Sequence, residues 1–367
     1  MIVPFVDLKA QYKSIKDEID RAIADVINET AFIGGKYVND FERKFAELYQ
    51  VKHCISCANG TDSLYIIMKM LGIGVGDEVI TPANTWISAS ETISQTGATP
   101  IFVDIDPLYH TIDETLLENK ITSRTKAIIP VHLQGQMCEM DTILAMAIKY
   151  GIAVIEDCAQ SHFSTYKSKR AGTIGIAGSF SFYPSKNLGA FGDAGCIITN
   201  DDALAEQCKR FARHGALVKH LHTIEGINSR MDGLHAAILS AKLPYILQWT
   251  EKRQANAEYY NKILSSIPQI TIPSVRPQTN HTYHLYVVRA QRRDELAAFL
   301  KSAGIETSVH YPVPLPFLEA YKYLGHQTLD FPVSHSYSHQ ILSLPMYPEL
   351  TEEMMSFVCK TIKTFYS

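Results

Sequence analysis

The sequence lacks the long apolar segments and the cysteine framework that are typical of membrane and secreted proteins. No apolar run approaches the roughly 20 residues that a helix needs to cross a bilayer. The N-terminus, MIVPFVDLKAQYKSIKDE, has no basic segment followed by a long apolar one. Seven cysteines are few for 367 residues, and their odd number indicates free thiols in a reducing compartment. These absences predict a cytoplasmic protein.

A zinc site is also missing from the pattern. Cys54 and Cys57 form a C-x-x-C, but they lie in the apolar run VKHCISCA, which is typical of a strand. Residues three apart on a strand face opposite sides, and no second Cys or His pair follows at zinc spacing. We therefore expect buried structural cysteines and no metal.

Neither sign of charge is in large excess. Lys plus Arg number 34 and Asp plus Glu number 38, so the net charge is −4. This balance gives no electrostatic reason to expect binding to nucleic acid or an anionic membrane. Apolar residues make up 46% and charged residues 20%, which is ordinary for a globular protein with a sizeable core. The length predicts a large domain with a smaller one.

Strand-like and helix-like segments alternate along the first 200 residues. After helical patterns at about 11–28 and 37–49, apolar runs at 53–58, 78–81, 100–104, 127–132 and 153–157 are separated by helical stretches such as 62–71, 86–96 and 141–150. Such alternation predicts an α/β fold, a mostly parallel sheet with helices on both faces. Two further strands, 179–183 and 195–199, have no long helix between them, which favours an antiparallel addition.

The remaining sequence predicts a small α+β C-terminal domain. A helical pattern runs from about 232 to 266 and is interrupted at Pro244, where we expect a break. Beyond it we expect a strand at 283–288, a helix at 293–303, a strand at 306–311, a Pro-rich loop and a last helix at 352–365. We place the large domain, with its N-terminal helices, at 1–250 and the small domain at 251–367.

Four separated segments carry residues that could take part in binding or catalysis, and no segment alone is a specific signal. Gly60 and Thr61 follow a strand and open a helix, so they could seat an anion or simply form a capping turn. Asp157 ends a strand, where open α/β sheets bind ligands, although it could also be a cap or an ion pair. Lys186 lies on a turn after a strand, and a lone loop lysine is usually a surface residue. The segment 228–232 precedes the long helix and by itself reads as a cap.

Together these residues meet the needs of one cofactor, pyridoxal phosphate. Its aldehyde needs a lysine, and its pyridine nitrogen needs an anionic partner so that the ring can withdraw electrons. Lys186 and Asp157 supply these groups. The phosphate needs N–H donors and hydroxyls, which Gly60–Thr61 and Ser181 supply, and an aromatic residue such as Trp86 must cover the ring.

The sequence resembles the pyridoxal-phosphate-dependent sugar aminotransferases of the DegT/StrS type. The resemblance extends over nearly the whole chain and includes NGTDSL (59–64), GDEVITPANTWISASETI (76–93), IEDCAQ (155–160), SFSFYPSKNLGAFGDAG (179–195), GINSRMDGLHAAIL (226–239) and HYPVP (310–314). It implies the type I fold of aspartate aminotransferase, with a seven-stranded, mixed and mostly parallel sheet in the large domain. It also implies a homodimer with shared active sites.

The resemblance assigns roles to individual residues. Lys186 and Asp157 become the catalytic residues, as the Schiff-base lysine and the partner of the pyridine nitrogen. The implied cofactor-binding residues are Gly60, Thr61, Trp86, Asp157, Gln160, Ser181, Lys186 and Asn228. Gln160 would contact the ring hydroxyl, and Asn228 would reach the phosphate in the neighbouring subunit.

The substrate is less sharply defined. Tyr183, Arg230, His310 and Tyr311 are the candidate contacts, with L-glutamate as the implied amino donor. We expect a dTDP-linked 3-keto-6-deoxyhexose used in making an amino sugar for a cell-surface polysaccharide, such as lipopolysaccharide, or a glycoside. A 4-keto nucleotide sugar, a nucleotide-free oxidised sugar acid of the 8-oxo-Kdo type and a catalytically silent regulatory homologue are the alternatives. The sequence departs from many relatives at LPFLEAY (315–321) and at Gln134, where Tyr is common.

Overall fold

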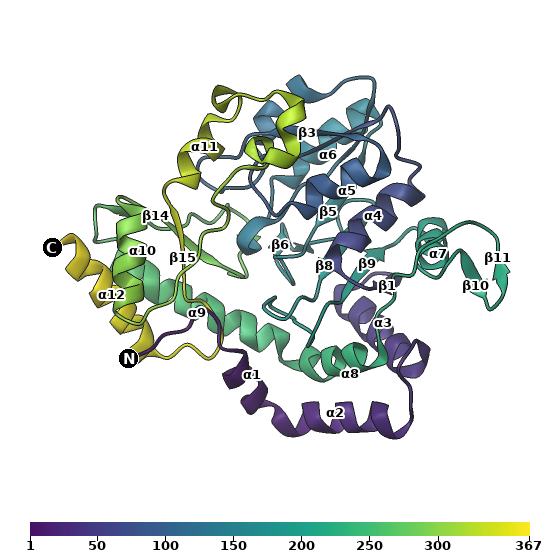
Figure 1. The fold of residues 1–367 in the computed structure, drawn as a ribbon, viewed down its shortest axis with the longest axis horizontal. Helices are drawn as coiled ribbons and strands as arrows, with labels where there is room; N and C mark the ends of the chain where they lie inside the picture. The colour runs from purple at the N-terminus through teal and green to yellow at the C-terminus, as the bar shows by residue number, and fades with distance from the viewer.

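The computed structural model describes all residues from 1 to 367 (Figure 1). Its centre is a seven-stranded sheet in the order β1-β9-β8-β5-β4-β2-β3. The strands are β1 (His53–Cys57), β2 (Glu78–Pro82), β3 (Thr99–Val103), β4 (Thr125–Ile128), β5 (Ala153–Asp157), β8 (Ala177–Ser181) and β9 (Gly195–Thr199). Neighbouring strands from β8 to β3 are parallel, whereas β9 is antiparallel to both β8 and β1. The predicted mixed, mostly parallel sheet is confirmed.

Helices cover both faces of this sheet (Figure 1). Next to the sheet are α3 (Gly35–Tyr49), α4 (Gly60–Met70), α5 (Ser88–Thr96), α6 (Met140–Tyr150) and α7 (Asp202–Phe211). α1 (Leu8–Ser14) and α2 (Lys16–Asn28) lie farther out, and α2 packs against α8 (Gly233–Lys242). The first predicted helix is two helices, because the backbone of Ile15 leaves the helical conformation (φ −136°).

Apolar clusters lie on both faces of the sheet because strand side chains alternate. Cys54 and Ile198 belong to one cluster, and Cys57 and Ile197 belong to the other. On the first face, Phe45 of α3 packs edge-to-face against Phe180 of β8, with ring centroids 5.4 Å apart. The two cysteines of the C-x-x-C therefore face opposite sides, as predicted. All seven cysteines are buried and free.

The long helical segment is broken near Pro244, as predicted. α8 ends at Lys242, a short 3-10 turn spans Leu243–Tyr245, and α9 (Ile246–Leu264) continues. The remaining elements are β12 (Ile270–Thr271), β14 (Tyr286–Ala290), α10 (Arg293–Ser302), α11 (Pro332–Ser338), β15 (Ile341–Leu344) and α12 (Glu352–Tyr366).

The strand predicted at 306–311 is wrong. In this stretch only Ser308 forms an isolated bridge, to Ser343, and the strand beside β14 is β15 instead. The sequence ILSL of β15 is buried at every position, whereas 306–311 is only partly buried and leads into Pro312 and Pro314, which limit further pairing.

The C-terminal part has an apolar cluster of its own, formed by α9, α10, α12, β14 and β15. Val3 belongs to this cluster and pairs with Ile305, so the first residues pack with the last hundred. α9 runs through residue 250 without a break. The division into domains at 250 stays a prediction.

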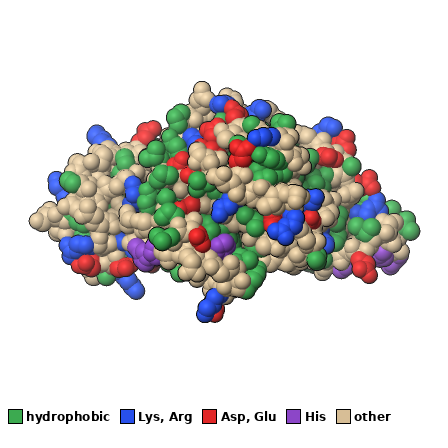
Figure 2. Space-filling model, turned by 90° about the horizontal axis from the view of Figure 1, so that it is seen from above, with side chains coloured by type: hydrophobic (Ala, Val, Ile, Leu, Met, Phe, Trp, Pro, Cys, Tyr) green, Lys and Arg blue, Asp and Glu red, His purple; other side chains and the backbone are tan.

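Two short ribbons complete the fold. The first joins β13 (Thr279–Asn280) to β6 (Thr165–Tyr166) and β7 (Lys169–Arg170), and thus links the C-terminal part to the large sheet's loops. The second, β10 (Ala216–Val218) with β11 (Leu221–His222), projects from one end of the molecule (Figure 1). No helix is long and apolar enough to cross a membrane. On the face shown in Figure 2, acidic and basic side chains are interspersed.

Candidate active site

A cavity of about 480 Å³ opens at the carboxyl ends of the parallel strands, between α4, the turn after β8 and the C-terminal segments. Open α/β sheets bind ligands at this edge. The predicted residues that line the cavity are Gly60, Thr61, Trp86, Asp157, Gln160, Ser181, Tyr183, Lys186, His310 and Tyr311. The structure therefore brings together ten residues spread over 250 positions of the sequence.

Asp157 is the last residue of β5 and is only 7% exposed. Its carboxylate Oδ1 accepts a hydrogen bond from the backbone N–H of Ala159 at 3.0 Å. Burial raises the pKa of Asp157, while that hydrogen bond and the charge of Lys186 act in the opposite direction. Such a carboxylate is stabilised when a cationic group approaches it from the cavity.

Lys186 lies in a tight turn after β8. Its backbone N–H donates to the carbonyl of Tyr183 at 2.8 Å, and Ala190 N–H donates to Phe182 at 2.7 Å. A side chain at Gly189 would meet the carbonyl oxygen of Pro184 at 2.3 Å, so the turn requires glycine there. The geometry fixes where the lysine side chain leaves the backbone.

The amine of Lys186 is poised for nucleophilic chemistry. Its Nζ makes no hydrogen bond or ion pair with the rest of the chain, although Asp157 lines the same cavity. Loss of hydration lowers the pKa of Lys186 to about 8, and the negative charge of Asp157 opposes this shift. A large share of the amine is therefore neutral near pH 8, as attack on an aldehyde requires.

Gly60 and Thr61 form an anion-binding corner at the start of α4. Asn59 caps the helix, with its Oδ1 accepting from Asp62 N–H at 2.8 Å. A Cβ on Gly60 would lie 2.6 Å from Cβ of Ser181, so glycine alone allows β8 to approach. Thr61 Oγ1 lies 2.7 Å from Ser88 Oγ. The helix N-terminus and these hydroxyls suit a phosphate.

Trp86 and Tyr311 form an aromatic wall, with ring centroids 5.7 Å apart and planes inclined by 44°. Gln160 Nε2 donates to the Tyr311 hydroxyl at 3.0 Å, and its Oε1 accepts from the backbone N–H of Gln134 at 2.7 Å. These two bonds orient the amide of Gln160. Gln134, a departure from many relatives, thus acts here through its backbone and not its side chain.

Asn228 and Arg230 do not line the cavity of their own chain. Both are exposed, and Arg230 Nε donates to Asn228 Oδ1 at 3.0 Å. The structure therefore separates these two predicted site residues from the other ten.

The cavity also contains polar residues that the sequence analysis missed, namely Asn59, Thr85, Ser88, Ser185, Asp193 and His284. Asn59, Thr85 and Ser185 adjoin a predicted residue, so proximity in sequence could have identified them. His284 is different, because it precedes β14 in the C-terminal part and no motif connects it to Lys186.

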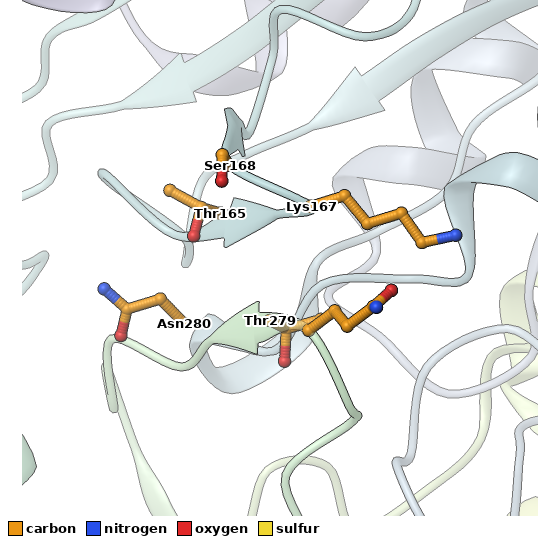
Figure 3. Close-up of a pocket in the computed structure, with 6 residues that line it drawn as sticks. Thr165, Lys167, Ser168, Thr279 and Asn280 are labelled. Atoms are coloured by element: carbon orange, nitrogen blue, oxygen red, sulfur yellow. The ribbon is translucent and has the colours of Figure 1, made fainter.

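A second hollow, of about 670 Å³, lies over the ribbon of β6 and β13 (Figure 3). Thr165, Ser168, Thr279 and Asn280 line it, and no carboxylate, histidine or cysteine is present. Lys167 extends away from Thr165 and Asn280 in Figure 3 and pairs with Asp141. The one ionisable side chain of its lining is thus held in an ion pair, and the other lining side chains carry hydroxyl or amide groups.

Three potential metal ligands, His132, Glu156 and Cys158, lie within 4.8 Å of one another below the sheet edge. Their atoms are already used. Glu156 accepts from His132 Nε2 and from three backbone N–H groups, and His132 Nδ1 accepts from the N–H of Cys138. These three residues are therefore part of a hydrogen-bond network that stabilises β5.

These features fit pyridoxal phosphate as a group. The corner at Gly60 accommodates a phosphate, the amine of Lys186 suits an aldehyde, and the buried Asp157 suits a protonated ring nitrogen. Close packing against Ser181 requires glycine at position 60, so the shape of the phosphate corner is set by the packing of α4 against β8.

Comparison with known proteins agrees with this geometry. Residues 13–363 match the DegT/DnrJ/EryC1/StrS aminotransferase family. The chain belongs to this family of sugar aminotransferases.

Three relatives align with this aminotransferase over nearly the full length of both chains. A "pleiotropic regulatory protein" from Geobacillus stearothermophilus is 44% identical over 100% of the chain and 99% of the relative. A UDP-2-acetamido-2-deoxy-3-oxo-D-glucuronate aminotransferase from Pseudomonas aeruginosa is 43% identical (98% and 99%). A dTDP-3-amino-3,6-dideoxy-alpha-D-galactopyranose transaminase from Aneurinibacillus thermoaerophilus is 42% identical (99% and 99%).

Solved structures show the same fold. DesV from S. venezuelae, in complex with a ketimine intermediate, has a TM-score of 0.98 and 38% identity over 100% of this chain and 99% of DesV. NtdA from Bacillus subtilis, with bound cofactor PMP, has a TM-score of 0.90 and 30% identity over 99% and 85%. The predicted α/β fold of the sugar aminotransferases is thus confirmed, and the family is dependent on pyridoxal phosphate.

Proposed function

We propose that this aminotransferase transfers an amino group from L-glutamate to a dTDP-linked 3-keto-6-deoxyhexose. The observation that carries the proposal is the unpaired Nζ of Lys186, with its lowered pKa, in one cavity with Asp157 and the Gly60 corner. That set suits pyridoxal phosphate, and membership of the family supports sugar amination.

Carbon 3 of the sugar is supported by two relatives. One is named for a 3-oxo sugar linked to UDP, and the other for a 3-amino sugar linked to dTDP. Both sugars react at C3, so the position of the ketone has more support than the nucleotide. The dTDP link and the 6-deoxy sugar are supported by the second of these relatives.

We assign Lys186 the central proton transfer. When bound, pyridoxal phosphate supplies an aldehyde that holds the amino group and a ring that withdraws electrons. The neutral Nζ of Lys186 can take the α-proton of the amino donor and deliver a proton to the carbon of the sugar that receives the amino group. Asp157 stabilises a cation opposite it and keeps the ring nitrogen protonated.

The other residues bind and orient. We assign the phosphate to the N–H groups of Gly60 and Thr61 with the hydroxyl of Ser181, and the ring to Trp86 and Gln160. Tyr183, 54% exposed at the cavity, is assigned to the sugar together with His310 and Tyr311 of the C-terminal part. Loss of water from this enclosed edge strengthens each of these hydrogen bonds.

We also propose a homodimer with shared sites. Asn228 and Arg230 lie outside their own cavity and are exposed, so a contact with a bound cofactor would be made in another copy. In that arrangement the amide of Asn228 donates to the phosphate in the partner's cavity.

A regulatory role is a second candidate, because one relative at 44% identity carries a regulatory name. A silent protein would not need the reactive amine at Lys186 or the constrained turn that carries it. We therefore place catalysis first.

One experiment tests both. Purified enzyme loaded with pyridoxal phosphate is mixed with L-glutamate, and the visible absorbance of the bound cofactor is followed. A panel of keto-sugars is then added: dTDP-linked 3-keto and 4-keto, UDP-linked 3-keto, and a nucleotide-free sugar acid. We expect loss of the absorbance with glutamate and recovery with the dTDP-linked 3-keto sugar. No change with glutamate would favour the regulatory role, and recovery with another sugar only would replace the proposed substrate.

A further inference from the structure

His284 is a buried residue of the cavity wall that has no role in the account above. It is 8% exposed and lines the cavity together with Lys186. Its side chain is held by Asn187, the residue that follows Lys186, although the two are 97 positions apart. The C-terminal part thus contacts the lysine-bearing turn through this histidine.

The neighbouring amide fixes which nitrogen of His284 carries the proton. Asn187 Nδ2 donates to the carbonyl oxygen of Thr282 at 3.1 Å, so the other side of the amide, Oδ1, faces His284 Nδ1 at 3.3 Å. A carbonyl oxygen only accepts, and therefore Nδ1 is the donor. In a neutral imidazole the second nitrogen, Nε2, then holds a lone pair.

The ring is neutral at physiological pH. Burial and the positive charges of Lys186 and Arg253 hold the pKa of His284 well below its usual range. Arg253 donates to the carbonyl oxygens of Tyr283 and His284, so its charge is held beside the ring. Protonation of Nε2 from solvent is therefore disfavoured.

The lone pair on Nε2 has no partner within the chain. No hydrogen bond of the protein involves this atom. The other cavity histidine, His310, also leaves Nε2 without a partner, but its Nδ1 contacts a hydroxyl, Ser343 Oγ at 2.8 Å, which can donate or accept and so does not fix the tautomer. His162 is also buried and unpartnered, but both its nitrogens are sealed from solvent and it does not line the cavity. His284 is thus the cavity histidine whose unused nitrogen is fixed as an acceptor.

We propose that His284 is a substrate-binding residue whose Nε2 accepts a hydrogen bond from a hydroxyl group next to the keto carbon of the sugar. The inference rests on the proposed function. Lys186 must reach the carbon that receives the amino group, so a hydroxyl on an adjacent carbon lies nearest the wall beside Lys186. Glutamate does not satisfy this acceptor, because its carboxylates only accept and its amino group is the group transferred. His284 therefore distinguishes the sugar from the amino donor.

The acceptor is held rigidly, as a specificity residue requires. Thr282 Oγ1 lies 2.8 Å from Ser164 Oγ, and Thr282 N–H donates to the carbonyl of Gly135 at 3.2 Å. A Cβ on Gly135 would meet Thr282 Oγ1 at 2.8 Å, so the two segments pack without spare room. Binding the hydroxyl costs little side-chain entropy.

Two substitutions test the roles of the two ring nitrogens of His284 separately. In His284→Asn the amide nitrogen can replace Nδ1 as donor to Asn187, but nothing replaces Nε2. In His284→Gln the longer side chain can place an amide oxygen near the position of Nε2, while the donor to Asn187 is lost. Both variants keep an uncharged polar side chain of similar volume.

We expect His284→Asn to raise KM for the keto-sugar about tenfold, the effect of one lost hydrogen bond, and to leave the glutamate half-reaction at the parent rate. His284→Gln should restore KM close to the parent value. Calorimetry gives a readout independent of turnover: dTDP-6-deoxyglucose, an unreactive analogue, is titrated into enzyme reduced with borohydride, and its Kd should follow the same order.

An unchanged sugar KM and an unchanged Kd in His284→Asn would overturn the inference. Equal slowing of the glutamate and sugar half-reactions would also overturn it, because His284 would then act by positioning Lys186. If the parent enzyme itself fails to aminate any keto-sugar, the proposed function fails first, and the two failures are distinguished by that control.

Discussion

At the scale of single residues, the site depends on the balance between burial and one opposing charge at Lys186. Burial lowers the pKa of this lysine to about 8, and the carboxylate of Asp157 raises it. Below pH 8 the amine is mostly protonated and unreactive, and above it the neutral form dominates. The rate at which apoenzyme attaches pyridoxal phosphate should therefore rise with pH and level off above about pH 8.

This prediction is checked by following the visible absorbance of the bound cofactor from pH 6 to 10. Asp157→Asn removes the charge that favours the ammonium form, so the midpoint should move to lower pH. Lys167→Met, at an exposed ion pair outside the cavity, serves as the control and should leave the profile unchanged. A midpoint near the usual lysine pKa of about 10.4 would contradict the structure.

Single residues also show which parts of the site could be predicted from the sequence and which could not. Lys186, Asp157 and Gly60 could be predicted because each lies at the end of a strand or shortly after one, and because together they meet the needs of one cofactor within motifs that resemble a known family. His284 could not be predicted, because its place in the wall depends on contact with Asn187, 97 residues away. No local periodicity encodes that contact.

At the scale of elements, the junction of α4 with β8 is set by the absence of a side chain at Gly60. Gly60→Ala would place Cβ at 2.6 Å from Cβ of Ser181, within the backbone-supported corner. We expect a loss of about 1–3 kcal/mol of stability from overpacking. The N–H groups would also move away from the phosphate, so the affinity for pyridoxal phosphate should fall.

Thermal unfolding with and without cofactor measures both effects. Gly74→Ala is the matched control, because the nearest atom to its Cβ, the carbonyl oxygen of Thr96, lies at 3.7 Å. The control should keep its unfolding temperature and its stabilisation by cofactor. If Gly60→Ala gained as much stability from the cofactor as the parent, the corner would not be the phosphate site.

Glu156 is a residue of β5, and its fully buried side chain forms hydrogen bonds that stabilise this strand. Its carboxylate accepts from His132 and from the backbone N–H groups of Gly172, Ile174 and Gly175. In Glu156→Gln one oxygen becomes an NH₂ group that faces donors, so buried donors lose their partner. We expect a cost of about 3 kcal/mol.

Chemical denaturation of the apoenzyme checks this value without interference from the cofactor. Glu118→Gln removes a carboxylate from an exposed ion pair and should leave the denaturation midpoint at the parent position. An equally small effect in Glu156→Gln would show that the network does not support β5.

Elements also show which parts of the fold follow from local pattern. Alternating apolar runs predicted all seven strands of the large sheet, since each run is followed by a helix or a tight turn. The C-terminal part was harder, because 306–311 and Ile341–Leu344 are both short segments without a periodicity that identifies the strand. Only packing against β14 decides that the second is the strand.

At the scale of the whole molecule, the position of Asn228 bears on whether one chain forms a complete active site. Its side chain is exposed and absent from the cavity of its own chain, yet the proposed dimer gives it a phosphate contact in the partner. Asn228→Asp would then place a negative charge against that phosphate and strongly reduce activity. In a monomer with independent sites the same change would have little effect.

Mixing two inactive variants tests the sharing directly. When Lys186→Ala and Asn228→Asp chains are unfolded and refolded together, half of the dimers contain one chain of each kind. In such a dimer one site has both defects, whereas the other takes Lys186 from one chain and Asn228 from its partner. About a quarter of the parent's sites should be restored, since a two-fold interface gives each chain the same contacts. The control mixture, Lys186→Ala with Asp157→Asn, should stay inactive, because both residues line the cavity of a single chain. Recovery in neither mixture, with dimers present by size-exclusion chromatography, would show that Asn228 does not act in the partner's site.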